Sequence, residues 1–137
     1  MIGIDTNVLV RYLTRDDEQQ SEIALDYLTH RCTPDQPGYI NRIVQCELVW
    51  VLGRAYQYSR EQISGALEMI FRTRQFLIED QETALAALRA YRQGKADYAD
   101  AFIGFANKAA GCDSTVTFDR SAARLGVFEH LQTNPSK

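Results

Sequence analysis

The sequence predicts an α/β domain built around a mainly parallel sheet. Short apolar runs of strand length alternate with longer segments of helical spacing, which is the pattern of successive βα units. No internal repeat, low-complexity tract or linker interrupts this alternation. Because 137 residues are enough to bury a single core, we expect one domain over residues 1–137, with residues 133–137 as a frayed tail.

The elements of the first half follow from periodicity and from turn residues. The apolar opening run ends in an acid, as a buried strand does before a turn, and a loop is expected where two of the prolines fall. Ser59 and Gln62 form the capping-box pattern that begins a helix. In order, we expect a strand at 1–5, helices at 7–14 and 16–30, a loop at 31–38, a strand at 39–41, helices at 42–56 and 59–73, and a strand at 76–79.

The second half continues the alternation. Gly94 is placed to end one helix, and an Ala-rich and Phe-rich segment begins the next helix at Tyr98. A β-rich run ends at Asp119. We therefore expect helices at 80–94 and from 98 to about 110, a strand at 114–118, a helical turn at 120–125 and a last strand at 127–131.

Composition narrows the class of protein. The three cysteines, Cys32, Cys46 and Cys112, are odd in number and widely spaced, which favours neither a disulfide framework nor a zinc site. The chain opens directly as structure, and no run reaches the roughly 18 apolar residues of a membrane span. A reducing cytoplasm is the expected compartment, with no membrane partner.

The net charge of −3 argues at first against a nucleic-acid partner, because such domains are usually basic on the binding face. If four carboxylates surround a bound metal ion, however, the rest of the chain carries a charge of +1. The position of the acids therefore matters more than their total.

Two aspartates end predicted strands. Asp5 and Asp119 lie at the carboxyl ends, where open α/β sheets place their ligands. Thr117, two residues before Asp119, points to the same side of its strand and offers a hydroxyl near the same place. The alternative for both aspartates is that they only cap the helical segment that follows.

Glu47 falls in the middle of an apolar helical stripe. Stepping about 100° per residue places Ile43, Val44, Trp50 and Val51 around it, so we expect it on the buried face. A carboxylate there must be protonated, paired or bound to a metal ion. Pairing with Arg54, two turns later on the same face, is the structural alternative.

Asp97 and Asp100 differ in their predicted surroundings. Asp100 borders the apolar side of its helix, an arc formed by residues 99, 102, 103, 106 and 110. Asp97 faces outward from the N-cap position. We therefore expect Asp100 to be a ligand and Asp97 a cap with at most a supporting role.

Four carboxylates from four segments suit a hard divalent cation. Mg²⁺ and Mn²⁺ are held by carboxylate and water oxygens, whereas the same charges without an ion would repel one another. One or two such ions can activate a water molecule and stabilise the leaving oxygen of a phosphodiester.

Four motif blocks resemble one known family. "IDTNVLVRYL", "CELVWVL", "DYADAFIGFA" and "TFDRSAARL" stand in the order and spacing of the PIN domain of the bacterial VapC type, the toxin of toxin–antitoxin pairs. The resemblance covers nearly the whole chain. It implies a three-layer α/β/α sandwich with a mainly parallel sheet of four or five strands. It also implies that the protein is a Mg²⁺-dependent endoribonuclease, which cleaves structured RNA with metal-activated water.

By position, Asp5, Glu47, Asp100 and Asp119 match the acidic quartet of this family, with Asp5 and Asp100 as the expected direct ligands. Thr6, Asn7, Asp97 and Thr117 match supporting positions. The resemblance also implies a homodimer, a larger toxin–antitoxin assembly and a cognate antitoxin that covers the acids. The apolar stretch "ISGALEMIF" is either part of such an interface or core. Neither His30 nor His130 lies in a motif block.

RNA binding needs cations and stacking surfaces. Candidate cations lie outside the quartet, foremost Arg11, Arg15, Arg42, Arg92 and Lys95, and then Arg72 and Arg74. Tyr56, Tyr58 and Tyr98 are candidate platforms for bases.

Other function classes fit less well. A receiver-type phosphorylation domain needs an acidic pair after its first strand and a lysine near its last, whereas "IDTNV" has one acid and "VTFDRS" no lysine. A non-catalytic acidic metal-binding interaction module of this fold remains an alternative, although all four acids are present. A PIN nuclease for housekeeping RNA processing, or one that acts on DNA, is the other.

Overall fold

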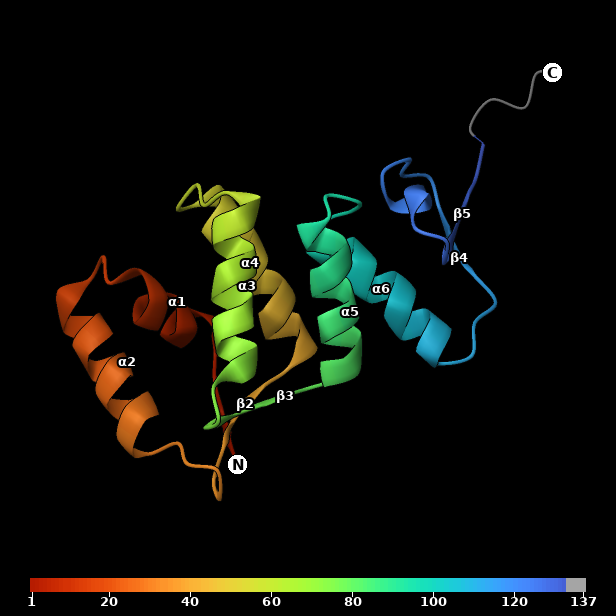
Figure 1. Ribbon diagram of the computed structural model, residues 1–137. Coiled ribbons are helices and arrows are strands. Elements are labelled where there is room, and N and C mark those ends of the chain that lie inside the picture. Colours follow the sequence, from red (N-terminus) through yellow and green to blue (C-terminus); the bar gives the residue numbers. More distant parts are fainter. Residues whose placement is uncertain (133–137) are drawn as a thin grey trace. The chain divides into compact units, whose positions relative to one another are not determined.

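The computed structural model describes residues 1–132, and the predicted tail at 133–137 lies outside the described residues. The chain divides into two compact units, Met1–Gln81 and Glu82–Lys137. Figure 1 shows the elements of the first unit in red to green and those of the second in green to blue. Each unit is described by itself below.

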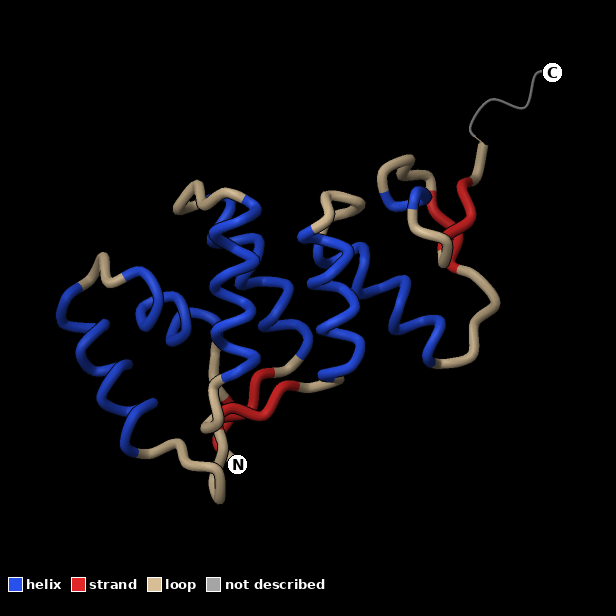
Figure 2. The backbone as a smooth tube through the Cα atoms, viewed as in Figure 1, coloured by secondary structure: helices blue, strands red, loops and turns tan. Residues whose placement is uncertain are grey.

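A three-stranded parallel sheet lies in the first unit (Figure 2). Its strands are β1 (Ile2–Gly3), β2 (Gly38–Ile40) and β3 (Phe76–Ile78), in the order β1-β2-β3. The register pairs Ile2 with Gly38 and Gly38 with Phe76. Because all three strands run in the same direction, their carboxyl ends meet at one edge of the sheet.

Four capped helices belong to the same unit, α1 (Thr6–Thr14), α2 (Glu18–His30), α3 (Arg42–Arg54) and α4 (Arg60–Arg72). Asp5, Asp17, Asn41 and Ser59 each accept a backbone N–H of the first turn that follows. The side chain of Gln62 returns a bond to the backbone of Ser59, which confirms the predicted capping box.

The core of the first unit takes a side chain from nearly every element. Leu9, Ile40, Leu48, Leu52, Leu67 and Ile70 are at most 1% exposed. The stretch "ISGALEMIF" lies within α4, and four of its apolar side chains are buried. Of the two interpretations of this stretch, an interface or core, the structure supports core, with Met69 as its exposed member.

Ser64 in α4 is a polar residue within this core. It is 1% exposed, and its hydroxyl has no hydrogen-bond partner among the described residues. We expect Ser64→Ala to stabilise the protein by about 1 kcal/mol, because it removes a buried hydroxyl that gains no bond. Urea denaturation measures the change. Ser59→Ala is the control of opposite sign, because it removes the cap of the same helix at a cost of about 1 kcal/mol.

The second unit consists of two helices and a two-stranded parallel sheet. Its helices are α5 (Gln81–Arg92), which starts at the unit boundary, and α6 (Tyr98–Ala109). Strand β4 (Thr115–Thr117) pairs with β5 (Phe128–His130), and the 3-10 turn η1 (Ala122–Arg124) connects them. The predicted helix end at Gly94 is confirmed, since this residue adopts a φ of +75° just after α5.

Tyr98 is the centre of the aromatic core of this unit. It is 0% exposed, and its ring centroid lies 6.4 Å from that of Tyr91 and 6.0 Å from that of Phe102. The interpretation of Tyr98 as a platform for bases was therefore wrong, because no face of its ring is open.

The pairing of all five strands in parallel confirms the predicted α/β class. Within residues 1–132, these strands form two sheets, one of three strands in the first unit and one of two strands in the second. Within residues 1–132, none of the helices has both the length and the apolar character required to cross a lipid bilayer.

Candidate active site

Asp5 follows β1 and caps α1. Its Oδ1 accepts the backbone N–H of Thr6 at 2.7 Å. The cap, which was the alternative to a ligand, is therefore formed. It occupies only one of the two carboxylate oxygens, and the side chain is exposed. A cap and a metal ligand are thus compatible roles for Asp5.

Thr6 connects Asp5 with the second acid of the first unit. The Thr6 hydroxyl donates to Oε1 of Glu47 in α3 at 2.6 Å. Within residues 1–132, the other oxygens, Oδ2 of Asp5 and Oε2 of Glu47, carry no hydrogen bond or ion pair. Two carboxylates held by one residue therefore each keep an oxygen available.

The predicted burial of Glu47 was wrong. Glu47 is exposed, and its neighbours Ile43 and Trp50 are 67% and 61% exposed. The buried side of α3 is formed by Val44, Gln45, Leu48 and Leu52. Gln45 lies inward because its amide nitrogen donates to the carbonyl oxygens of Ile40 and Glu79, which end β2 and follow β3. Apolar periodicity alone could not show that Gln45 rather than Glu47 lies on the buried side of α3.

Arg54 does not compensate Glu47. Its guanidinium lies over the ring of Trp50, 5.4 Å from the centroid, and no ion pair joins it to Glu47 within residues 1–132. The structural alternative for Glu47 is thereby removed.

In the second unit, Asp119 follows β4 and lies beside Thr117. The backbone N–H of Asp119 donates to the Thr117 hydroxyl at 3.0 Å, as expected from their places on the strand. The carboxylate Oδ1 accepts the backbone N–H of Ser121 at 2.8 Å. Asp119, like Asp5, is an exposed carboxylate with one oxygen engaged by its own turn.

Asp100 is half-buried in the first turn of α6. Burial raises its pKa above the usual range, and the charges of Asp119 and Asp97 and a side-chain hydrogen bond with Asp119 raise it further. The charges of Asp97 and Asp119 therefore make the ionised form of Asp100 less favourable.

The predicted difference between Asp97 and Asp100 is confirmed, because Asp97 is exposed and stands at the N-cap of α6. Its side chain makes no capping hydrogen bond, however, so the cap is positional only. The predicted apolar arc was mostly wrong. Phe102 is buried as expected, but Ile103 is 50% exposed. The buried side of α6 is formed by Tyr98, Ala101, Phe102 and Gly104.

The carboxylates suit a small hard cation. Within residues 1–132, neither unit brings three or more His, Cys, Asp or Glu side chains into a group that could hold a metal ion alone. Mg²⁺ does not need such a group, because it is usually held by one or two carboxylates together with water and substrate phosphate. The open oxygens of Asp5 and Glu47, and the pair of Asp100 and Asp119, fit this requirement.

Arg11 is committed to its own unit. It donates to Asp16 at 2.8 Å, to Gln20 at 2.6 Å and to the Tyr56 hydroxyl at 3.1 Å, and Tyr56 donates to Asp16 at 2.7 Å. The pKa of Asp16 is lowered, first by the bond from Tyr56. This network joins α1, α2 and the segment after α3, so Arg11 and Tyr56 have structural roles that the sequence did not indicate.

The other candidate cations differ in availability. Arg42 pairs with Asp80 at 3.1 Å. Arg15 and Lys95 are exposed, without an ion pair among residues 1–132. Arg92 is exposed at the end of α5. Of these cations, Arg15 and Lys95 are therefore the ones open to a phosphate backbone without first leaving a carboxylate.

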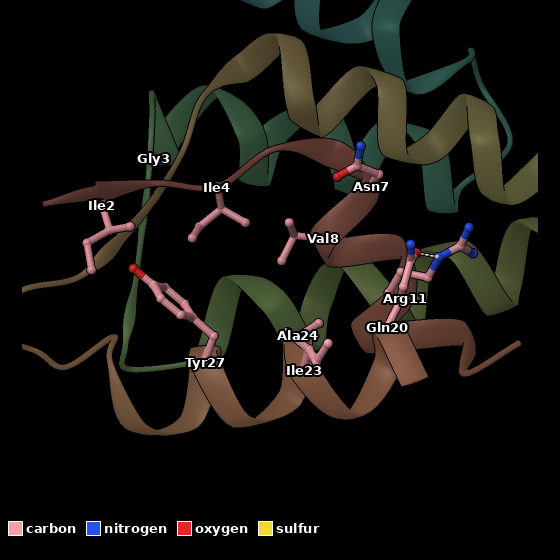
Figure 3. A pocket seen from close by; sticks show the side chains of 10 residues that line it. All are labelled: Ile2, Gly3, Ile4, Asn7, Val8, Arg11, Gln20, Ile23, Ala24 and Tyr27. Atoms are coloured by element: carbon pink, nitrogen blue, oxygen red, sulfur yellow. Dashed lines mark hydrogen bonds between the residues drawn. The ribbon is translucent and has the colours of Figure 1, made fainter. Parts of the chain in front are cut away.

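Figure 3 shows a pocket of about 660 Å³ within the first unit, beside β1 and between α1 and α2. No carboxylate lines it, so it is distinct from the acids described above. The sequence did not indicate this pocket, because it arises from the spacing between elements. Its lining is mostly apolar: Ile2, Gly3, Ile4, Asn7, Val8, Arg11, Gln20, Ile23, Ala24 and Tyr27.

Comparison with known proteins identifies the family of the chain. A model of the PIN domain matches residues 2–127, which span both units. A VapC ribonuclease of Aquifex aeolicus (strain VF5) is 24% identical over 123 residues, covering 90% of this chain and 90% of that protein. All four acids lie inside the matched range. The chain therefore belongs to the PIN domain family.

Proposed function

We propose that this protein is a Mg²⁺-dependent endoribonuclease that cleaves structured RNA as the toxin of a type II toxin–antitoxin module. The observation that carries the proposal is the pair formed by Asp5 and Glu47, two carboxylates that share Thr6 and each keep an open oxygen. The similarity to a VapC ribonuclease supports RNA as the substrate. Residues 1–137 act as a single PIN domain.

The four acids would hold the metal ion. Asp5 and Asp100 are direct ligands of one or two Mg²⁺ ions, Mn²⁺ being a substitute, and Glu47 and Asp119 complete the acidic set. When bound, such an ion stabilises the negative charge that develops on the phosphodiester and makes water more acidic. Burial and the neighbouring carboxylates raise the pKa of Asp100, so a cation bound there would have to displace a proton that this acid holds more readily than an ordinary aspartate does.

Each unit also supplies supporting side chains to its own acids. Thr117 accepts the N–H of Asp119 and so fixes the turn after β4. Asp97 adds negative charge near Asp100. Asn7 follows Thr6 in α1 and is exposed. Arg15 and Lys95 are the cations best able to bind the RNA backbone, followed by Arg92, whereas Arg11 and Arg42 must first release their carboxylate partners.

Purified protein should cleave a folded RNA in the presence of Mg²⁺ or Mn²⁺, and EDTA should stop the reaction. We expect Asp5→Asn to reduce the cleavage rate by more than about 100-fold, because loss of even an outer-shell partner costs 10–100-fold at metal sites. Asp35→Asn, in the exposed loop before β2, is the control and should retain activity. Gel analysis of labelled RNA measures both.

The cleavage assay, together with expression in a host cell, separates the proposed toxin from the other functions considered. Cleavage of DNA but not RNA would point to a DNA nuclease. Mn²⁺ binding without cleavage of either would point to a non-catalytic interaction module. Cleavage of RNA without growth arrest on expression in a host cell would favour housekeeping RNA processing over a toxin.

We further propose a cytoplasmic homodimer that assembles with a cognate antitoxin, also in larger complexes. The open oxygens of Asp5 and Glu47 are suited to a basic side chain of such a partner, which would compete with the metal ion. Added Mg²⁺ should then weaken the complex, as measured by calorimetry with the purified antitoxin.

A further inference from the structure

We propose that Thr6 is a positioning residue whose hydroxyl orients the Glu47 carboxylate toward the metal ion. The inference rests on the proposed function, since it concerns the same acids. It adds that one neutral hydroxyl of α1 holds the Glu47 carboxylate of α3 and that metal affinity depends on this bond. The juxtaposition was not visible in the sequence, because 41 residues separate the two side chains.

The surroundings of Thr6 fix its conformation. It is the first residue of α1 and only 8% exposed, although it contacts two exposed acids. Its backbone N–H is held by Asp5 at 2.7 Å and its hydroxyl donates to Glu47 at 2.6 Å. A hydroxyl bond to an ionised carboxylate is short and about twice as strong as a neutral bond.

The position of Thr6 in its helix leaves the hydroxyl free for this purpose. A threonine within a helix usually donates to the carbonyl four residues before it. Thr14, at the other end of α1, does so, donating to the carbonyl oxygen of Val10 at 2.8 Å. At the first helical position no such helical carbonyl is present, so the hydroxyl of Thr6 can bind a partner on another helix.

The bond also has a directional consequence for Glu47. A glutamate side chain on an exposed helix surface has three rotatable bonds and many rotamers. Holding Oε1 against Thr6 removes most of that freedom and leaves Oε2 as the oxygen available to a cation. Asp5 is constrained in the same manner through the backbone of the same residue. Thr6 therefore sets the positions of both carboxylates of the first unit.

Three variants separate this role from a general effect on α1. Thr6→Val keeps the shape and the backbone N–H that binds Asp5 but lacks the hydroxyl. Thr6→Ser restores the hydroxyl. Thr14→Val removes a hydroxyl from the same helix whose partners are the Val10 carbonyl and the Asp16 carboxylate, and neither of these is bonded to Glu47. Binding of Mn²⁺ alone, without RNA, is measured by calorimetry, and melting in EDTA reports the fold.

We expect Thr6→Val to weaken Mn²⁺ binding about 10–100-fold, the range found when a partner of a metal ligand is removed. Thr6→Ser and Thr14→Val should retain the wild-type affinity. In the Glu47→Gln background, Thr6→Val should add no further loss, because the neutral amide offers the ion no charged oxygen for Thr6 to orient.

The outcomes distinguish this inference from the proposed function. Failure of the wild-type protein to bind Mn²⁺ would overturn both. Wild-type affinity in Thr6→Val, or equal losses in Thr6→Val and Thr14→Val, would overturn the role of Thr6 alone. If Thr6→Val melts at a lower temperature than the wild type in EDTA, Thr6→Ala is measured in its place. A loss of Mn²⁺ affinity in Thr6→Ala that adds to the loss in Glu47→Gln would contradict the inference.

Discussion

Asp100→Asn is expected to abolish RNA cleavage while stabilising the metal-free protein. Cleavage should fall by more than about 100-fold, because the substitution removes a proposed direct ligand of the ion. Stability should rise, because the carboxylate at this position is half-buried and faces the charges of Asp119 and Asp97. An amide of the same shape has no charge to desolvate and no like charge to repel.

The gain in stability should depend on pH. The pKa of Asp100 is raised in the folded state, so its contribution to folding is complete below the ordinary value of 3.8 and is lost as the pH rises through the raised value. Asparagine behaves like the protonated acid at every pH. The difference in stability between the variant and the wild type should therefore be small near pH 4 and larger at neutral pH.

Thermal melting in EDTA from pH 4 to pH 8 measures this difference, with Asp113→Asn as the control. Asp113 is an exposed acid in the turn before β4 and should show no comparable dependence on pH. Addition of Mn²⁺ should stabilise the wild type more than Asp100→Asn. A variant that cleaves RNA at the wild-type rate, or that melts lower than the wild type at neutral pH, would contradict the role given to Asp100.

Gly104→Ala is expected to destabilise the second unit, although alanine is the better helix former. A Cβ atom at Gly104 would lie 2.5 Å from Cε2 of Phe128 and 2.7 Å from Cγ2 of Val127. Overpacking of this kind typically costs about 1–3 kcal/mol, whereas the gain in helix propensity is about 1 kcal/mol. A net loss of up to about 2 kcal/mol should follow.

Gly65→Ala in α4 is the matched control. Nothing lies within 4 Å of a Cβ atom at Gly65, so the same substitution in another helix should stabilise the protein by about 1 kcal/mol. Urea denaturation followed by circular dichroism measures both variants. Replacing the Phe128 ring with the smaller leucine side chain, in Gly104→Ala/Phe128→Leu, should recover part of the lost stability. If Gly104→Ala raised the free energy of unfolding as Gly65→Ala is expected to do, α6 would not approach β5 as closely as the structure indicates.

The order and type of the elements could be predicted from the sequence because each depends on local signals. Periodicity placed the six helices, and Ser59, Gln62 and Gly94 marked boundaries that the structure confirms. The family was predicted from four motif blocks and is supported by the match over residues 2–127. The predicted fold, an α/β fold of the PIN type with parallel strands, is thereby confirmed.

The faces of two helices could not be predicted in the same way. A helical wheel shows which residues share a side but not which neighbour covers that side. On α3 the inward position belongs to Gln45, whose amide binds two carbonyl oxygens, while Trp50 lies outward under Arg54. The contact of Thr6 with Glu47 was equally hidden, because it depends on how α1 and α3 pack rather than on either segment.

The capping of α1 by a single oxygen of Asp5 has a consequence for how the ion enters and leaves. Oδ1 holds the N–H of Thr6 and the Asp5 carbonyl oxygen holds those of Val8 and Leu9, so Oδ2 could take up a cation with no rearrangement of the backbone. Under the proposed function, such a site is already shaped for its ion, and occupancy would follow the free Mg²⁺ concentration rather than a slow conformational step. Control of activity would then come from outside the site, through a molecule that competes for the open oxygens.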